Sequence, residues 1–244
     1  MLKPALVLTL FAALSESFRA PARAPITANF FAQLTAPKGL PKNYAQVYSQ
    51  AIAGVSAALD KRERGVEVDF PPIEENYGRG DGSASTQRRV DTANNVFVGK
   101  LVPALSLGRK VVVLGGGRSF GGRGIADPAA RAEAERADVC VVVAPALDGE
   151  WRVVEQLVAL PGGKPAVVVV NGLAQNGILP HAYFYRPMTA RSVRTGAVVR
   201  RYPGEYEAFN LAGVKAPVAV PLAQQGNRRL PNTGEAQMYL FEKS

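Results

Sequence analysis

The sequence holds a single cysteine, Cys140, and a single histidine, His181, among 244 residues. A disulfide within the chain is therefore excluded, and a metal site built from histidine and paired cysteine ligands is not expected. Cys140 lies in the apolar run DVCVVVAP, which predicts a buried structural thiol. A catalytic triad would need His181 as its base, but the chain has no G-x-S-x-G motif to supply the nucleophile. His181 follows Pro180 at the start of a predicted strand, so we expect it to be a surface or capping residue. We predict no catalytic residue, metal or cofactor.

Long hydrophobic runs are also lacking. Beyond the first 14 residues, no apolar run approaches the roughly 20 residues that a membrane-spanning helix requires. The longest are VVVL at 111–114, VCVVVA at 139–144 and AVVVV at 166–170, which have the length of strands. We expect a mature protein without a transmembrane helix, soluble or peripherally attached to a membrane.

The N-terminal residues have the three-part order of a secretory signal peptide. Lys3 precedes the apolar run ALVLTLFAAL at 5–14, and Ser15 and Ser17 place small residues before a cleavage point. The run is too short to span a bilayer. We therefore predict a cleaved signal peptide at 1–17.

Acidic residues are absent between Glu16 and Asp60. This stretch opens with Phe18-Arg19-Ala20-Pro21 and continues basic and rich in Ala and Pro, and transit peptides are likewise poor in acids. A signal peptide followed by Phe-x-x-Pro resembles the bipartite presequences of algae with red-type secondary plastids. We expect residues 18–42 to be a transit-like segment that directs import into a plastid, to the stroma or the thylakoid surface. The alternative is a secreted protein with a flexible N-terminal linker.

The net charge of +9 is unevenly distributed. Residues 1–42 carry five basic residues and one acidic residue, so a charge of +5 remains after their removal. A mature charge of this size is weak support for nucleic-acid binding, and we expect no nucleic-acid partner.

The remaining chain, 43–244, predicts one α/β domain. Apolar residues recur at helical spacing in four segments. These segments are 44–59, 85–108, 128–137 and 149–160. The three wholly apolar strands alternate with helices, which favours parallel pairing in the middle of a covered sheet. The more polar segments 181–187, 196–203 and 206–211 predict an antiparallel extension. The expected fold is a single layered α/β domain with a mixed, mostly parallel central sheet flanked by helices.

The segment GVEVDFPP at 65–72 alternates apolar and acidic residues. This alternation predicts a half-exposed strand that ends at Pro71-Pro72, with Glu67 and Asp69 on the solvent face.

The glycine-rich segment GGGRSFGGRG at 115–124 follows a predicted strand. It lacks the Lys and the Ser or Thr of a Walker loop, and it does not fit the dinucleotide pattern G-x-G-x-x-G. Backbone amides and guanidinium groups can still bind an anion, and a mobile surface loop is the alternative. The candidate anion-binding residues are Gly115, Gly116, Gly117, Arg118 and Arg123.

Asp148 follows the strand at 139–144. Ligands of α/β sheets bind at the carboxyl ends of strands, but aspartate is also a preferred helix N-cap. We favour the N-cap.

Five arginines and four tyrosines interleave between Tyr183 and Tyr206. This mixture suits a protein interface, a site for RNA or single strands, or a solvated strand face. No nucleic-acid motif accompanies it, so we favour an interface or a solvated face. The candidate interface residues are Tyr183, Tyr185, Arg186, Arg200 and Tyr202.

Six segments occur in an order that extends over roughly residues 40–222. They read NYAQVYSQAIAGVSAAL, GVEVDFPP, RRVDTANNVF, APALDGEWRVVEQL, VVVVNGLAQ and FYRPMTARSVRTGAVVRRYPGEYEAF. This order resembles the plant and algal family called domain of unknown function 1995 (DUF1995), which includes low-photosystem-II-accumulation assembly factors of the chloroplast. A similar domain is attached to some plastid adenylate kinases. The family often has a Trp near Tyr206, which this chain lacks.

The resemblance implies a stromal or thylakoid-associated protein that binds photosystem or thylakoid-membrane assembly components, and it brings no agreed catalytic residues. Our first hypothesis is accordingly a non-catalytic plastid assembly or maintenance factor. The alternative is a domain that binds a nucleotide or phosphate ligand through residues 115–124. Such a domain could be an enzyme.

Overall fold

The computed structural model describes residues 39–71, 84–116, 123–172, 179–190, 193–211, 216–225 and 228–241. The predicted signal peptide, the transit-like segment up to residue 38, and the candidate loop residues Gly117 and Arg118 lie outside this range.

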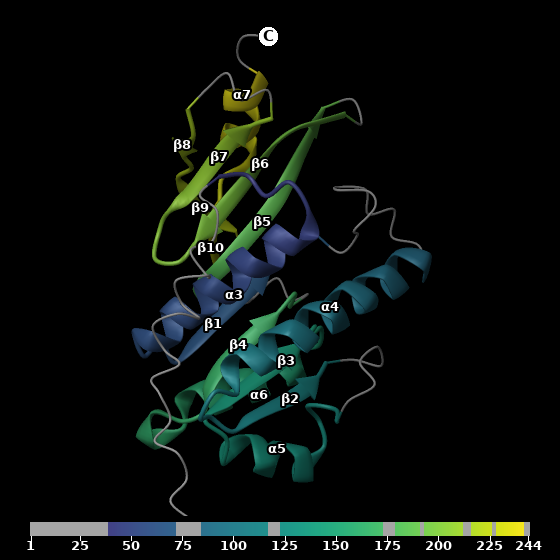
Figure 1. Ribbon diagram of the computed structural model, residues 1–244, viewed down its shortest axis with the longest axis vertical. Coiled ribbons are helices and arrows are strands. Elements are labelled where there is room, and N and C mark those ends of the chain that lie inside the picture. The colour runs from purple at the N-terminus through teal and green to yellow at the C-terminus, as the bar shows by residue number, and fades with distance from the viewer. Residues whose placement is uncertain are drawn as a thin grey trace, which may run out of the picture. The chain divides into compact units, whose positions relative to one another are not determined.

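Eight of the described strands form one sheet, in the order β2-β3-β4-β1-β5-β6-β7-β8 (Figure 1). The parallel strands are β1 (Gly65–Asp69), β2 (Val111–Gly115), β3 (Val139–Val143), β4 (Ala166–Val170) and β5 (His181–Ala190). The antiparallel continuation is β6 (Val193–Arg201), β7 (Tyr206–Asn210) and β8 (Val218–Ala219). A separate antiparallel pair is formed by β9 (Leu222–Gln225) and β10 (Arg228–Pro231). The predicted mixed, mostly parallel sheet with an antiparallel extension is confirmed.

One face of the sheet is covered by α3 (Tyr44–Asp60) and α4 (Ala84–Leu105), as Figure 1 shows. Asn43 is the N-cap residue of α3, and its side chain accepts the backbone N–H of Gln46. Rings of Tyr48, Phe70 and Phe97 join α3, the end of β1 and α4, with centroids 5.1 to 5.8 Å apart. Aromatic pairs at this spacing add to the stabilisation that area burial provides.

The opposite face of β2, β3 and β4 is covered by α5 (Pro128–Glu135) and α6 (Asp148–Ala159), and the short helix η1 (Pro161–Gly163) follows α6. Trp151, Val154 and Leu157 of α6 are buried against this face, while Val153 and Leu160 are partly buried. With helices on both faces, every residue of β3 is buried. This double cover explains why the strands are wholly apolar.

The strand β1 departs from the sequence prediction. It was expected to be half-exposed, but it lies between β4 and β5 in the interior of the sheet. Glu67 is only 1% exposed, whereas Asp69 at the end of the strand reaches solvent. The alternation of apolar and acidic residues therefore predicted the strand correctly and its solvent exposure wrongly.

The C-terminal strands have their own small core. Helix α7 (Thr233–Phe241) packs on β6 and β7. This core is formed by Phe184, Met188, Val198, Tyr206, Ala208, Val220 and Ala236. Tyr183 contacts α3 and the next residue, Phe184, contacts the α7 core, so α3 and α7 lie on opposite faces of this part of the sheet.

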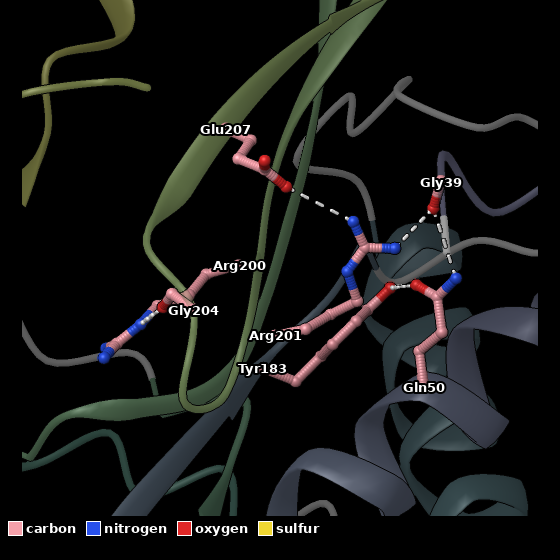
Figure 2. Close-up of polar contacts among 7 residues, drawn as sticks. All are labelled: Gly39, Gln50, Tyr183, Arg200, Arg201, Gly204 and Glu207. Atoms are coloured by element: carbon pink, nitrogen blue, oxygen red, sulfur yellow. Dashed lines mark hydrogen bonds and ion pairs between the residues drawn. The ribbon is translucent and has the colours of Figure 1, made fainter. Parts of the chain in front are cut away.

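Residues just before α3 are attached to the domain. The carbonyl of Gly39 accepts hydrogen bonds from Arg201 Nη1 at 2.7 Å and Gln50 Nε2 at 3.3 Å (Figure 2). Pro41 is buried. Residues 39–42, predicted to be the end of the transit-like segment, thus pack on the folded domain.

Candidate functional site

The predicted anion-binding loop begins at the end of β2. Gly115 is the last residue of β2 and Gly116 follows it. A Cβ on Gly116 would lie 2.4 Å from the carbonyl oxygen of Ala144, so glycine is required where the ends of β2 and β3 approach. Arg123 forms an ion pair with Glu133 of α5. The guanidinium group predicted to receive an anion is therefore already paired with a carboxylate.

Carboxylates also accept backbone N–H groups at the starts of the two helices that follow β2 and β3. Asp127 accepts the backbone N–H of Ala129 at 2.9 Å at the start of α5. Glu150 accepts those of Ala146 and Leu147, at 2.7 and 3.1 Å, at the start of α6. Helix N-termini favour anions through these same N–H groups. Asp127 takes one such N–H group of α5, and Glu150 places a carboxylate in the first turn of α6, where its charge disfavours a second anion.

The predicted N-cap role of Asp148 is wrong. Helix α6 begins at Asp148, and Leu147 is its N-cap residue. Glu150, in the first turn of the helix, reaches back to accept the backbone N–H groups of Ala146 and Leu147, as the acidic residue of a capping box does.

The carboxyl edge of the sheet has a topological switch point between β1 and β4. The connection after β1 leads to β2 on one side, whereas the connection after β4 leads to β5 on the other. Asn171 follows β4 at this point. Its Oδ1 accepts the backbone N–H of Phe70 at 2.9 Å, and its Nδ2 donates to Asn94 Oδ1 at 2.7 Å. Ligands of open α/β sheets bind at such points.

Two further features mark this edge. Ala144 and Asn171, which follow neighbouring strands, have left-handed backbone φ values of 49° and 48°. Such conformations cost roughly 1–3 kcal/mol each for residues other than glycine and cluster at functional sites. Within the described residues, the buried donors Asn94 Nδ2 and Trp151 Nε1 have no acceptor. Asn94 is beside Asn171, and Trp151 packs on Gly172.

Two of the predicted interface residues are not on the surface. Tyr183 and Tyr185 are buried, which corrects their assignment to an exposed face. The Tyr183 hydroxyl donates to Gln50 Oε1 at 3.2 Å beneath α3 (Figure 2). Because α3 covers this face of β5, alternate tyrosines of the strand belong to the core.

The other three predicted residues reach solvent. Tyr202 is partly exposed and its hydroxyl donates to Glu63 at 2.9 Å, which raises the pKa of Tyr202. Arg186 has an exposed side chain and lies 3.7 Å from an oxygen of Asp69. Arg200 is partly exposed and donates from Nε to the carbonyl of Gly204 at 3.0 Å. The structure therefore places the two arginines, without Tyr183 and Tyr185, on the surface.

Both arginines stack on one aromatic cluster. The Cζ of Arg186 lies 5.2 Å from the centroid of Phe184, and that of Arg200 lies 5.1 Å from the centroid of Tyr206. The two rings contact each other edge to face at 5.5 Å. Guanidinium groups over aromatic faces are held by cation–π attraction.

A buried polar group beneath this cluster was missed by sequence reasoning. His181 was expected at the surface or at a cap, but it is 3% exposed, and its Nδ1 lies 2.6 Å from the hydroxyl of Tyr206. Glu67, also buried, is its register partner on β1. No local pattern could have found this group, because the pairing of β1 with β5 brings together residues more than 100 positions apart in the chain.

The charge of the domain is segregated along the chain. Residues 43–178, here called the N-terminal part, contain 15 basic and 15 acidic residues. Residues 179–244, the C-terminal part, contain nine basic and four acidic residues. The full charge of +5 that remains beyond residue 42 thus belongs to the C-terminal part.

Cys140 is buried, as predicted, and burial raises its pKa to about 12. The thiolate needed for nucleophilic or metal chemistry is therefore strongly disfavoured. Among the described residues there is no cluster of three or more His, Cys, Asp or Glu side chains able to hold a metal ion. None of the described helices combines the length and apolar character needed to cross a bilayer.

Comparison with known proteins identifies the family. No curated protein and no solved structure is significantly similar to the chain. The family model described as domain of unknown function (DUF1995) matches residues 41–233, which include every strand described above and end at the first residue of α7. The chain therefore belongs to the DUF1995 family.

Proposed function

We propose that the chain is a non-catalytic plastid protein that assists photosystem assembly or maintenance by binding other proteins, with peripheral attachment to the thylakoid as one mode of access to them. The presequence-like N-terminus supports the location, and the family resemblance supports the role. The observation that carries protein binding is the segregation of charge: the C-terminal part holds nine basic and four acidic residues, and the N-terminal part is neutral.

This segregation favours association with an oppositely charged partner. A one-sided charge accelerates encounter and orients the approach. Arginine is enriched among the residues that dominate interface energies. Arg186 and Arg200 are accessible on this part of the molecule. The proposed binding surface is therefore the C-terminal part around these two residues.

Location can be tested separately from binding. Residues 1–42 fused to a fluorescent reporter are expected to deliver it to the plastid of an alga with a red-type secondary plastid. Replacing the aromatic residue by Phe18→Ala is expected to divert the reporter to the secretory route. Secretion of the unmodified fusion would overturn the plastid assignment.

Binding can be tested by purifying the mature protein from isolated plastids and identifying what accompanies it. Photosystem subunits or thylakoid assembly components are expected, in amounts unchanged by ribonuclease and reduced at high salt, because exposed charges are screened. A protein that elutes alone at low salt would contradict the proposed function.

Ligand binding at the carboxyl edge is a second candidate function. Its support is the switch-point position of Asn171 together with the buried donors Asn94 Nδ2 and Trp151 Nε1. Since Asp127 and Glu150 place carboxylates at the starts of α5 and α6, a neutral ligand with acceptor atoms fits better than a phosphate. A thermal-shift screen with nucleosides, nucleotides and sugar phosphates tests this. A shift that is lost in Asn94→Ala would support a ligand, and no shift with any compound would remove it.

A further inference from the structure

We infer that Arg186 and Arg200 form a receptor for carboxylate groups, and that its ligand is an acidic polypeptide segment. The inference rests on the proposed protein-binding function and names the chemistry of the partner. It concerns one face of the C-terminal part, built by β5, β6 and β7.

The register of the sheet places the two arginines on the same face. Phe184 pairs with Arg200, and Arg200 pairs with Tyr206, so these three residues form one row across β5, β6 and β7. Arg186 is two residues beyond Phe184 on β5 and therefore projects from the same side. Arg201, the next residue after Arg200, projects to the other side, where it binds Gly39 and Glu207 (Figure 2).

The aromatic cluster holds the guanidinium groups in place before any partner arrives. Phe184 and Tyr206 are themselves buried, so the rings provide a fixed base. Stacking 5.2 and 5.1 Å above these rings restricts both arginine side chains. A side chain ordered in advance loses less entropy on binding, which favours affinity.

The hydrogen-bonding capacity of the pair is only partly used. Arg200 donates from Nε to Gly204, and within the described residues its two terminal nitrogens have no hydrogen-bond or ion-pair partner. Arg186 has one carboxylate, Asp69, at 3.7 Å and half of its side chain in solvent. Each guanidinium group therefore keeps N–H donors available on its outer edge.

The residue types favour carboxylates of a polypeptide over a diffuse anionic surface. Seven of the nine basic residues in the C-terminal part are arginines. Arginine presents a planar fork that matches a carboxylate with two parallel hydrogen bonds, whereas attraction to a charged membrane requires only charge, which lysine supplies equally well. The excess positive charge of the C-terminal part adds attraction for a segment that carries several acidic side chains.

The inference is tested with the full-length chain and a fluorescently labelled oligo-glutamate peptide, with an oligo-glutamine peptide of equal length as its neutral counterpart. Binding to oligo-glutamate alone is expected. The double variant Arg186→Gln, Arg200→Gln is expected to weaken it about tenfold, as for loss of charge-assisted hydrogen bonds. The control Lys100→Gln, Arg152→Gln removes the same charge from exposed positions of the N-terminal part and is expected to change it less than about twofold.

A charge-preserving variant separates the fork geometry from simple attraction. Arg186→Lys with Arg200→Lys keeps the net charge but removes the planar forks, so most of the tenfold loss is expected to remain. Full binding by the lysine variant, an equal loss in the control, or no binding of oligo-glutamate by the wild-type chain would each overturn the inference. The inference would also be overturned if the glutamine variant lost binding only to vesicles that contain phosphatidylglycerol and not to oligo-glutamate. That result would indicate a membrane surface as the ligand. Because this assay involves no plastid, its failure is distinguishable from mislocalisation of the reporter.

Discussion

The N-terminal and C-terminal parts of the domain use charge in opposite ways. In the N-terminal part, acids and bases are equal in number, and several acids bind groups of the protein itself. Asp127 and Glu150 accept backbone N–H groups at the starts of helices, and Glu133 pairs with the side chain of Arg123. In the C-terminal part, basic residues outnumber acids, and Arg186 and Arg200 keep donors exposed above buried rings. Under the function proposed above, the first part supports the fold and the second meets the partner.

Helix α3 connects the two parts, because it packs on β1 in the first and on β5 and β6 in the second. A contact in α3 that reaches the C-terminal part should therefore affect both together. The largest expected effect comes from breaking that contact, and the smallest from a surface ion pair confined to one part.

Gly54 is where α3 meets β5. A Cβ at this position would lie 2.4 Å from the backbone carbonyl oxygen of Ala182, so Gly54→Ala is expected to lower the free energy of unfolding by about 3 kcal/mol. Gly99 in α4 has open space around it, and Gly99→Ala is expected to raise stability by about 0.5–1 kcal/mol through helix propensity. Urea unfolding measures both. Equal effects at the two glycines would contradict the close packing of α3 on β5.

Asn171 tests the carboxyl edge of the N-terminal part. Asn171→Ala removes the hydrogen bonds to Phe70 and Asn94 and puts alanine at a φ of 48°, so a loss of about 2–3 kcal/mol is expected. Asn171→Gly loses the same hydrogen bonds but tolerates the backbone conformation, and the difference between the variants reports the strain. If both variants unfold at the wild-type urea concentration, the asparagine pair does not stabilise this edge.

The contact of Gly39 tests how the start of the domain is joined to the C-terminal part. A chain that begins at residue 43 lacks the carbonyl bound by Gln50 and Arg201 and is expected to be about 1–2 kcal/mol less stable than one that begins at residue 36. Arg201→Gln should lower the free energy of unfolding less in the shorter chain, because the hydrogen bond from Arg201 to Gly39 is already missing there. Additive losses would show that the two groups act independently.

Asp138 gives the smallest expected effect. Its hydrogen bond with Lys164 at 2.5 Å, together with the backbone N–H of Lys110, lowers the pKa of Asp138. The lowered pKa means that its contribution is present above the unfolded value near 4 and is lost as the pH falls through the folded value. Since the pair is largely exposed, Asp138→Asn is expected to cost no more than about 0.5 kcal/mol at neutral pH. Unfolding curves of the two proteins should converge in acid, and a difference that grows there would contradict the assignment.

Much of the architecture could be predicted because its signals are local. The apolar stripe of α3, the proline that opens α5 and the valine runs of β3 and β4 each specify an element through the residues within it. The burial of Cys140 was predicted for the same reason, since it lies inside a wholly apolar strand.

The candidate sites were less predictable because they depend on which strands become neighbours. Arg186 and Arg200 were identified by composition, but nothing local showed that Tyr183 and Tyr185 point beneath α3. Asn171 and Asn94 form their contact across 77 positions of sequence, beyond the reach of any local pattern.

By itself, the sequence determined the types of the elements, the single α/β domain and the excess of positive charge near the C-terminus. These follow from periodicity and composition, which are properties of short segments. Only the tertiary structure decided that β1 lies between β4 and β5, which buries Glu67 beside His181. The pairing of β5, β6 and β7 likewise placed Arg186 and Arg200 over Phe184 and Tyr206. The physical reason is that burial is set by the neighbours on both sides of a strand, and those neighbours come from distant parts of the chain.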